Sequence, residues 1–144
     1  MIGILGYCTE AEDIGQQTFI QFYKSLDKFR GDASIGTYLT RIAINLSINE
    51  IRRRKRRRRF FISNSENKIE NIPDKKDTID HKEAKEIVKK GIQKLEPKFR
   101  AVIVLRLING YSTQETAQIL KIPVGTVLSR LSRAQMKLKR IIKL

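Results

Sequence analysis

Residues 111–134 read YSTQETAQILKIPVGTVLSRLSRA, a pattern typical of two short helices joined by a tight turn. Ser112 precedes the first helix and Glu115 follows three residues later, so the two side chains form a capping box that satisfies two backbone amides. Lys121 lies in the turn. Pro123 then starts the second helix where its missing N–H breaks no helical hydrogen bond. The stretch therefore predicts a helix-turn-helix.

The second of these helices has an apolar side and a polar side. The apolar stripe recurs at three- and four-residue spacing and consists of Val124, Val127, Leu128 and Leu131. The opposite side carries Thr126, Ser129, Arg130 and Arg133. Hydroxyl and guanidinium groups on a helix face can donate to guanine edges and phosphates in the major groove. We expect this side to bind DNA; the alternative is a helical hairpin with an ordinary solvated face.

The chain of 144 residues carries a formal net charge of +15. Both ends are strongly basic, whereas acidic residues outnumber basic ones between residues 64 and 86. A polyanion is the expected partner, and nucleic acid is favoured over a membrane. No apolar run approaches the length of a membrane span, and the N-terminus lacks the features of a signal peptide. We expect a cytoplasmic protein without membrane insertion.

No residues are arranged for catalysis or for a metal. The sequence contains no Ser/His/Asp set and no glycine-rich phosphate loop. Its one cysteine, Cys8, and its one histidine, His81, exclude an internal disulfide and a zinc-ligand cluster. We expect neither enzymatic activity nor a cofactor.

Helical periodicity continues in the first half of the chain. One predicted helix ends near residues 30–32, and its aromatic face, expected mostly in the core, consists of Phe19, Phe22, Tyr23 and Leu26. The stripe of the next helix consists of Ile35, Tyr38, Leu39, Ile42, Ala43 and Leu46. We assign Tyr38 to the core as well.

A polar segment separates this half from the rest. Residues 63–83 are rich in polar and charged side chains, contain Pro73 and show no apolar period, which is typical of a flexible linker. Helicity resumes at residue 84, and Pro97 starts a further helix that Gly110 closes. The predicted fold class is all-α, with two small helical domains, residues 1–62 and 84–144, joined by the linker.

Eight consecutive basic residues occupy positions 52–59, at the end of the second helix. Like charges packed this densely repel one another unless a polyanion neutralises them. Contacts with DNA phosphates, which position a protein without specifying a sequence, are the favoured interpretation. The alternative is a disordered basic tail.

Three segments resemble the extracytoplasmic-function group of bacterial RNA polymerase sigma factors. They are AEDIGQQTF at residues 11–19, LDKFRGDAS and YLTRIAINLSINEIRR within residues 26–53, and residues 95–140 with IPVGTV at 122–127. Together they cover nearly all of the chain outside the linker. The resemblance implies a four-helix promoter-melting domain (region 2), a tether, and a helix-turn-helix domain (region 4) that reads the minus-thirty-five element.

The resemblance also implies partners. Asp13, Gln16 and Gln17 match the segment that grips the clamp helices of the largest subunit of RNA polymerase core, and the flap of the second-largest subunit is a further implied contact. An anti-sigma factor is an implied regulator. Without the resemblance, the favoured interpretation of the three residues is the polar first turn of an amphipathic helix.

A second set of matched residues concerns promoter DNA, double- and single-stranded. Asn45 matches the region that captures unstacked bases of the minus-ten element, because an amide can hydrogen-bond a base edge. The neighbouring Arg52, Arg53 and Arg54 are expected to hold the backbone. The alternative for Asn45 is a buried, hydrogen-bonded side chain.

The chain departs from the family pattern at several positions. The family usually has Glu at Gln17, Asp at Asn49, Gly at Lys121 and commonly Lys at Leu128. The loss of two carboxylates is expected to weaken the polymerase contact or an ion pair that braces the helices. A left-handed conformation at Lys121 would cost roughly 1 kcal/mol.

The front of the chain also differs, because family members carry about another helix before the Glu-Asp segment and only residues 1–9 precede it here. We expect that this start is internal to a longer reading frame. The alternative is a truncated domain that leaves an apolar face uncovered.

The leading hypothesis is a sigma factor that directs RNA polymerase core to promoters and assists their opening. A plain helix-turn-helix regulator, whose front half only dimerises, is the second. A basic helical RNA-binding or scaffold protein is the third. The matches at residues 13–19 and around Asn45 favour the first, since a dimerising module has no need of them.

Overall fold

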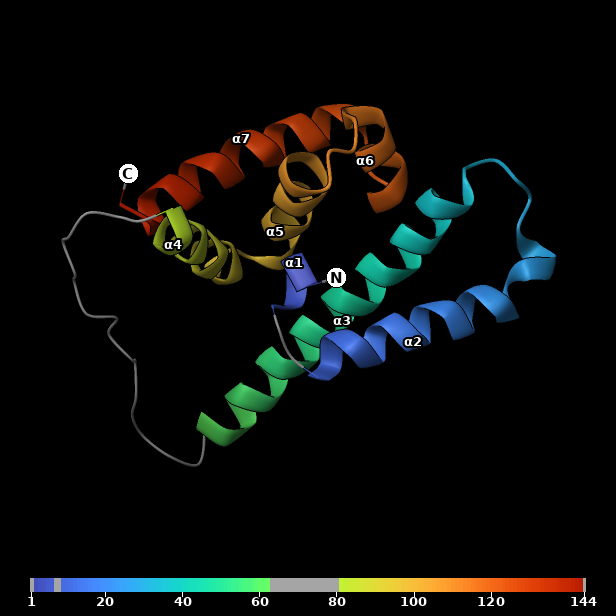
Figure 1. Ribbon diagram of the computed structural model, residues 1–144, viewed down its shortest axis with the longest axis horizontal. Helices are drawn as coiled ribbons and strands as arrows, with labels where there is room; N and C mark the ends of the chain where they lie inside the picture. Colours follow the sequence, from blue (N-terminus) through green and yellow to red (C-terminus); the bar gives the residue numbers. More distant parts are fainter. Residues whose placement is uncertain (1, 7–8, 63–80, 144) are drawn as a thin grey trace.

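The computed structural model describes residues 2–6, 9–62 and 81–143, and every regular element in these ranges is a helix (Figure 1). The elements are α1 (Ile2–Leu5), α2 (Thr9–Lys24), the 3-10 helix η1 (Leu26–Lys28), α3 (Ile35–Ile62), α4 (His81–Lys94), α5 (Pro97–Ile103), the π-helix η2 (Val104–Ile108), α6 (Thr113–Leu120) and α7 (Val124–Ile141). The all-α class is confirmed. Helix α4 begins three residues before the predicted residue 84, and the rest of the predicted linker, residues 63–80, lies outside the described residues. No described helix is both long enough and apolar enough to span a membrane.

The front module consists of α2, η1 and α3, and its two long helices run antiparallel (Figure 1). Ala11, Ile14 and Thr18 are the buried residues of α2, and Ala43 and Ser47 are buried on α3. The hydroxyls of Thr18 and Ser47 each donate to a carbonyl four residues earlier at 2.7 Å. These small side chains therefore allow a close helix crossing without unsatisfied polar atoms.

The aromatic face of α2 lies outside the core, so that expectation is wrong. Phe19 is 66% exposed and Tyr23 76% exposed; Leu26 is exposed too, and only Phe22 is half-buried. The buried face of α2, with Ala11, Ile14 and Thr18, lies about a quarter turn from the predicted one, and of the four predicted residues only Phe22 falls on it. The larger face is left in solvent.

Three aromatic rings close the loop between η1 and α3. The centroid of Tyr38 lies 5.2 Å from that of Phe29 and 6.0 Å from that of Phe22, in tilted or edge-on geometry. Tyr38 is accordingly half-buried in this small cluster. The predicted stripe of α3 is otherwise only partly correct, because Ile35 is exposed and Ile44, which the prediction left out, is buried.

The back module consists of α4 to α7 and is built around α5. Side chains on every side of α5 and the start of η2 are buried: Phe99, Arg100, Ala101, Val102, Ile103, Val104 and Leu105. The close crossing of α4 and α7 depends on Gly91, since a Cβ there would lie 2.7 Å from Cγ2 of Ile142. Helix α5 is therefore the central element on which the helix-turn-helix is mounted.

The helix from Pro97 widens into a π-turn before it ends, which periodicity did not predict. The amide of Asn109 donates to the carbonyl of Val104 at 2.9 Å, five residues back. Gly110 then takes a φ of +73°, as its predicted closing position requires. The amide of Tyr111 donates to the carbonyl of Leu105 at 3.0 Å, so the chain turns sharply toward α6.

The predicted turn geometry of the helix-turn-helix is confirmed. The amide of Glu115 donates to the hydroxyl of Ser112 at 3.1 Å, and the amide of Ser112 donates to the carboxylate of Glu115 at 2.7 Å. These bonds hold the pKa of Glu115 below its ordinary value. Lys121 has φ 53° and ψ 47°, the left-handed conformation, and the amide of Ile122 donates back to the carbonyl of Ala117 at 3.1 Å.

The inward stripe of α7 is shifted from the prediction. Val124 is 43% exposed and Leu128 53% exposed, whereas Val127 and Ala134 are fully buried and Leu131 is half-buried. Helix α6 and α5 cover only a narrow strip of α7, so the wider apolar stripe expected from spacing does not fit beneath them. Leu128 lies at the edge, facing solvent.

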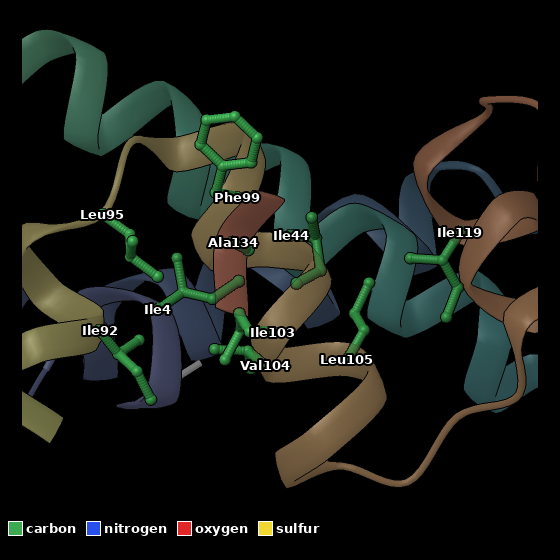
Figure 2. Packing of buried hydrophobic residues seen from close by; sticks show 10 residues of the cluster. All are labelled: Ile4, Ile44, Ile92, Leu95, Phe99, Ile103, Val104, Leu105, Ile119 and Ala134. Atoms are coloured by element: carbon green, nitrogen blue, oxygen red, sulfur yellow. The ribbon is translucent and has the colours of Figure 1, made fainter. Parts of the chain in front are cut away.

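Helix α1 lies between the two modules (Figure 1). Ile4 is fully buried and reaches Ile44 of α3 as well as Ile92, Leu95 and Val104 of the back module (Figure 2). The shared core of this junction comprises Ile4, Ile44, Ile92, Leu95, Phe99, Ile103, Val104, Leu105, Ile119 and Ala134. The sequence predicted only a tether between the modules, yet they share a core.

Polar contacts reinforce the junction. The guanidinium of Arg100 donates to the carbonyl of Ile4 at 2.9 Å and to that of Leu95 at 3.0 Å. The hydroxyls of Thr40 and Tyr111 lie 2.9 Å apart, one donating to the other. Each of these hydrogen bonds is partly or wholly shielded from water. Removing one partner there leaves a buried polar group unsatisfied, which lowers the free energy of unfolding more than it would at the surface.

Replacing Lys121 by Gly should stabilise the protein by about 1 kcal/mol, because glycine adopts the left-handed conformation without a Cβ penalty. The matched control, Lys139→Gly in the exposed interior of α7, should cost about 1 kcal/mol. Urea unfolding of both variants measures the difference. A loss of stability at both positions would contradict the left-handed assignment.

Replacing Arg100 by Met should destabilise the protein by roughly 3 kcal/mol, because several buried carbonyls lose their donor at once. Arg140→Met on the exposed side of α7 is the matched control and should change the free energy of unfolding by less than about 0.5 kcal/mol. Equal unfolding midpoints for the two variants would show that Arg100 is dispensable to the junction.

Candidate nucleic-acid and polymerase interface

The outer side of α7 brings together the residues predicted to read DNA. Ser129 and Arg133 are exposed, and Thr126 and Arg130 flank them as half-buried side chains. The hydroxyl of Ser129 donates to the carbonyl of Thr126 at 3.1 Å, which leaves its lone pairs available. Helix α6 and its capping box hold the start of this helix, so the four side chains are presented on a rigid element.

The basic run at residues 52–59 is helical within α3, so the alternative of a disordered tail is wrong. The buried carboxylate of Glu50 binds Nε of Arg53 at 2.8 Å and, more weakly, Arg54 at 3.4 Å and Arg57 at 3.6 Å. Arg54 also reaches Glu10 of α2 at 3.2 Å. Part of the run therefore braces α3 against α2 and neutralises its own charge.

Asn45 is exposed on α3, so the alternative of a buried, hydrogen-bonded asparagine is wrong. Arg52 is exposed too, and no ion pair joins it to any carboxylate of the described ranges. Of the three arginines predicted beside Asn45, Arg53 and Arg54 point toward Glu50 and Arg52 does not. The helix separates them, because Glu50 faces α2 and Arg52 faces solvent.

A cavity of about 370 Å³ opens at the loop before α3, and sequence reasoning did not find it. Its lining combines aromatic rings and cations: Lys28, Phe29, Arg30, Gly31, Asp32, Ala33, Tyr38, Arg41 and Gln118. Rings beside cations are suited to stacking a base while holding its phosphate. Gln118 belongs to α6, and its carbonyl accepts a hydrogen bond from Arg41 at 2.9 Å. The signal in the sequence was the loop Phe29-Arg30-Gly31-Asp32, whose Gly31 has φ +76°.

On α2, the residues predicted to contact polymerase lie on the solvent side. Asp13, Gln16 and Gln17 are exposed, and Ile20 and Tyr23 continue the same side one and two turns later. Apolar side chains rimmed by polar ones are typical of a protein-binding surface. The structure therefore brings these predicted residues together with Tyr23, which the sequence had assigned to the core.

The two amides that replace family carboxylates share one cleft. Gln17 and Asn49 both line a cavity of about 220 Å³ between α2 and α3, together with Asp13, Glu50 and Arg53. An ion pair that braces the two helices is nevertheless present, and Glu10 of α2 provides it by binding Arg54 of α3 at 3.2 Å. Among the described residues no group of three or more His, Cys, Asp or Glu side chains is placed to hold a metal.

Family models match both modules. The model of sigma-70 region 2 matches residues 2–57, and that of sigma-70 region 4 matches residues 85–138. The ECF RNA polymerase sigma factor SigW of Bacillus subtilis is 34% identical over 95% of this chain and 78% of its own length. The RNA polymerase sigma-H factor of Pseudomonas aeruginosa is 36% identical over 88% of this chain and 69% of its own length.

Solved structures share the fold. Sigma factor RpoE of Bartonella quintana, in complex with the anti-sigma factor NepR, superimposes with a TM-score of 0.72 at 24% identity, over 99% of this chain and 87% of that chain. CnrH in complex with the cytosolic domain of CnrY gives a TM-score of 0.66 at 26% identity, over 98% and 77%. From these matches, the chain belongs to the extracytoplasmic-function sigma factors of the sigma-70 family, with region 2 in its front module and region 4 in its back module.

Proposed function

The family directs RNA polymerase to promoters, and we propose how this chain does so. Helix α7 reads the minus-thirty-five element, and α3 with its preceding loop captures the minus-ten element. The observation that carries the proposal is the exposed side of α7, where Thr126, Ser129, Arg130 and Arg133 converge on a helix fixed by α6. The match of region 2 over residues 2–57 removes the plain-regulator hypothesis.

For the minus-ten element, the loop cavity and Asn45 supply complementary chemistry. Phe29 and Tyr38 offer ring faces for an unstacked base, and Arg30 offers a cation for its phosphate. Asn45 offers an amide for a base edge. Arg52 is the arginine of the predicted trio that is available for the backbone. Capture of unpaired bases by these groups would favour the opened promoter over the closed duplex.

For polymerase, the exposed side of α2 is the contact assigned to the clamp helices of the largest subunit. Asp13 and Gln16 supply polar partners, and Ile20 and Tyr23 supply apolar area. Region 4 is assigned to the flap of the second-largest subunit. This work on polymerase and DNA would take place in the cytoplasm.

An anti-sigma factor is part of the proposal as well. Both solved relatives are held in complexes, RpoE with the anti-sigma factor NepR and CnrH with the cytosolic domain of CnrY. The exposed aromatic residues of α2 offer such a partner the apolar area that monomeric surfaces seldom leave in water.

Replacing Asp13 and Gln16 together by Ala should weaken binding to core polymerase about tenfold, or about 1.4 kcal/mol, because the polar rim of the α2 surface is lost. Asp27→Ala with Gln135→Ala, an exposed acid and an exposed amide elsewhere, is the matched control. Fluorescence anisotropy of labelled protein titrated with core measures both affinities. Equal affinities for the two double variants would remove α2 from the polymerase interface.

Arg130→Ala should relax base preference at one position of the upstream element by roughly 1–3 kcal/mol, whereas Arg133→Ala should weaken all sequences alike. The reason is that a bidentate arginine distinguishes guanine, and a phosphate contact does not. Duplexes that bind the complex of this protein with polymerase core are selected first. Each selected duplex then competes for binding with variants that differ at a single base, which gives the base preference at each position. Uniform weakening by Arg130→Ala would shift base reading to Thr126 or Ser129.

A further inference from the structure

The cavity at the loop before α3 has walls from both modules. Most of its lining comes from the loop and the start of α3, whereas Gln118 belongs to α6 of the back module. Helix α6 lies beside the start of α3 (Figure 1), and a guanidinium nitrogen of Arg41 donates to the carbonyl of Gln118 at 2.9 Å. The complete cavity of about 370 Å³ therefore exists only while the two modules are packed together. We call this arrangement the closed chain.

The closed chain is too short to bind both promoter elements at once. The minus-ten and minus-thirty-five elements lie about 25 base pairs apart, which is about 85 Å along duplex DNA. Arg41 precedes Asn45 by one turn of α3 and contacts α6, and α7, which follows α6, is only about 27 Å long. The modules must therefore separate on a promoter. A ligand of the complete cavity is consequently a free molecule and not promoter DNA bound at both elements.

Three cations line the cavity: Lys28, Arg30 and Arg41. No carboxylate in the described part of the chain lies within ion-pair distance of any of them. Nε of Arg41 is buried and has no hydrogen-bond partner among the described residues. A buried donor without an acceptor is unfavourable, and an anion in the cavity would supply the acceptor. The three cations match a diphosphate, which carries about three negative charges at neutral pH.

The rest of the lining is suited to a base. The ring centroids of Phe29 and Tyr38 lie 5.2 Å apart, and the hydroxyl of Tyr38 donates to Oγ of Ser25 at 3.1 Å, which holds its ring in place. A fixed aromatic ring can stack on a base. Asp32 is exposed at the cavity, and its carboxylate accepts hydrogen bonds but donates none. Guanine offers a carboxylate two adjacent donors, N1–H and its 2-amino group, whereas the corresponding edge of adenine offers only its 6-amino group. The lining thus favours guanine.

We propose that this cavity binds a guanosine diphosphate and that the bound nucleotide holds the chain closed. The volume lies in the range of small-ligand pockets, roughly 300–1,000 Å³. A ligand that binds only the closed chain shifts the equilibrium away from the open chain, and it lowers the affinity for polymerase and promoter by the same coupling. The proposal concerns the regulation of the proposed promoter capture and rests on that function for its biological effect.

Isothermal titration calorimetry of the full chain with GDP, ADP and inorganic pyrophosphate tests the site. GDP should bind about tenfold more tightly than ADP, because only guanine places two donors on Asp32. Asp32→Asn should weaken GDP about tenfold and change ADP less than about twofold. Asp27→Asn, at an exposed acid that does not line the cavity, is the matched control and should change neither. Equal affinities for GDP and pyrophosphate would reveal an anion site without a base pocket and would overturn the nucleotide assignment.

Two further variants test the cations and the need for both modules. Arg41→Gln should weaken GDP at least about tenfold, and Arg140→Gln, an exposed arginine of α7 outside the cavity, should not. Ile4→Asn disturbs the shared core without touching the cavity and should also weaken GDP about tenfold. Circular dichroism shows whether the variants keep their helices. Undiminished GDP binding by a helical Ile4→Asn variant would show that the front module alone forms the site and would refute the closed-chain requirement.

Competition with polymerase tests the regulatory effect, and it needs only the unmodified chain and folded surface variants. With GDP at about a hundred times its Kd, the affinity of the unmodified chain for core should fall about a hundredfold, and that of Asp32→Asn only about tenfold at the same concentration. Asp27→Asn should behave like the unmodified chain. Unchanged core affinity, although calorimetry shows GDP bound, would overturn the regulatory effect.

Failures of the two proposals are distinguishable, because the calorimetric titrations contain no polymerase. If the unmodified chain does not bind core in the absence of nucleotide, the proposed function is refuted. If it binds core normally but does not bind GDP, the nucleotide site alone is refuted.

Discussion

The junction of the two modules depends on one buried guanidinium group. Arg100 lies in the central helix and donates to backbone carbonyls at the ends of α1 and α4, Ile4 and Leu95, and to the side chain of Gln93. Burial is the main cause that lowers the pKa of Arg100, and Arg54 adds to it. The charge is retained because these oxygens replace the water it gave up. Region 2 is thereby attached to the same residue around which region 4 is packed.

The parts of the fold that local interactions determine could be predicted from the sequence. The capping box at Ser112 and the left-handed turn at Lys121 depend on residues within a few positions of each other, and both are present. The buried face of α2 could not be predicted in the same way. Periodicity defines a face, but the choice between the aromatic side and the side with Ala11 and Thr18 is made by the shape of α3. The shared core at Ile4 likewise involves partners distant in sequence.

The site shows a similar division. Composition indicated a polyanion, the residue pattern indicated the outer side of α7, and the resemblance assigned Asn45 and Asp13. Asn45, Asp13, Ser129 and Arg133 lie exposed, and Thr126 and Arg130 are half-buried beside them. In the basic run, some arginines pair with Glu50 and others do not. Which ones pair depends on their angular position around the helix relative to Glu50, and the number of basic residues in the run does not reveal it. The cavity at Phe29 arises from a loop and a helix of the other module, so no single stretch encodes it.

The contact between Ile4 and Arg100 also has a consequence for folding kinetics. These residues are 96 positions apart, and the pairing of Arg41 with Gln118 spans 77. The pairs α2–α3 and α6–α7 are held by contacts close in sequence, and such contacts form fast. Closing a loop of nearly the whole chain loses conformational entropy before any stabilising contact is made. Each helical hairpin should thus assemble early, and the insertion of α1 should come last. During synthesis, region 2 would therefore emerge and fold first, and α1 would lack its partners in region 4 until that region has been synthesised.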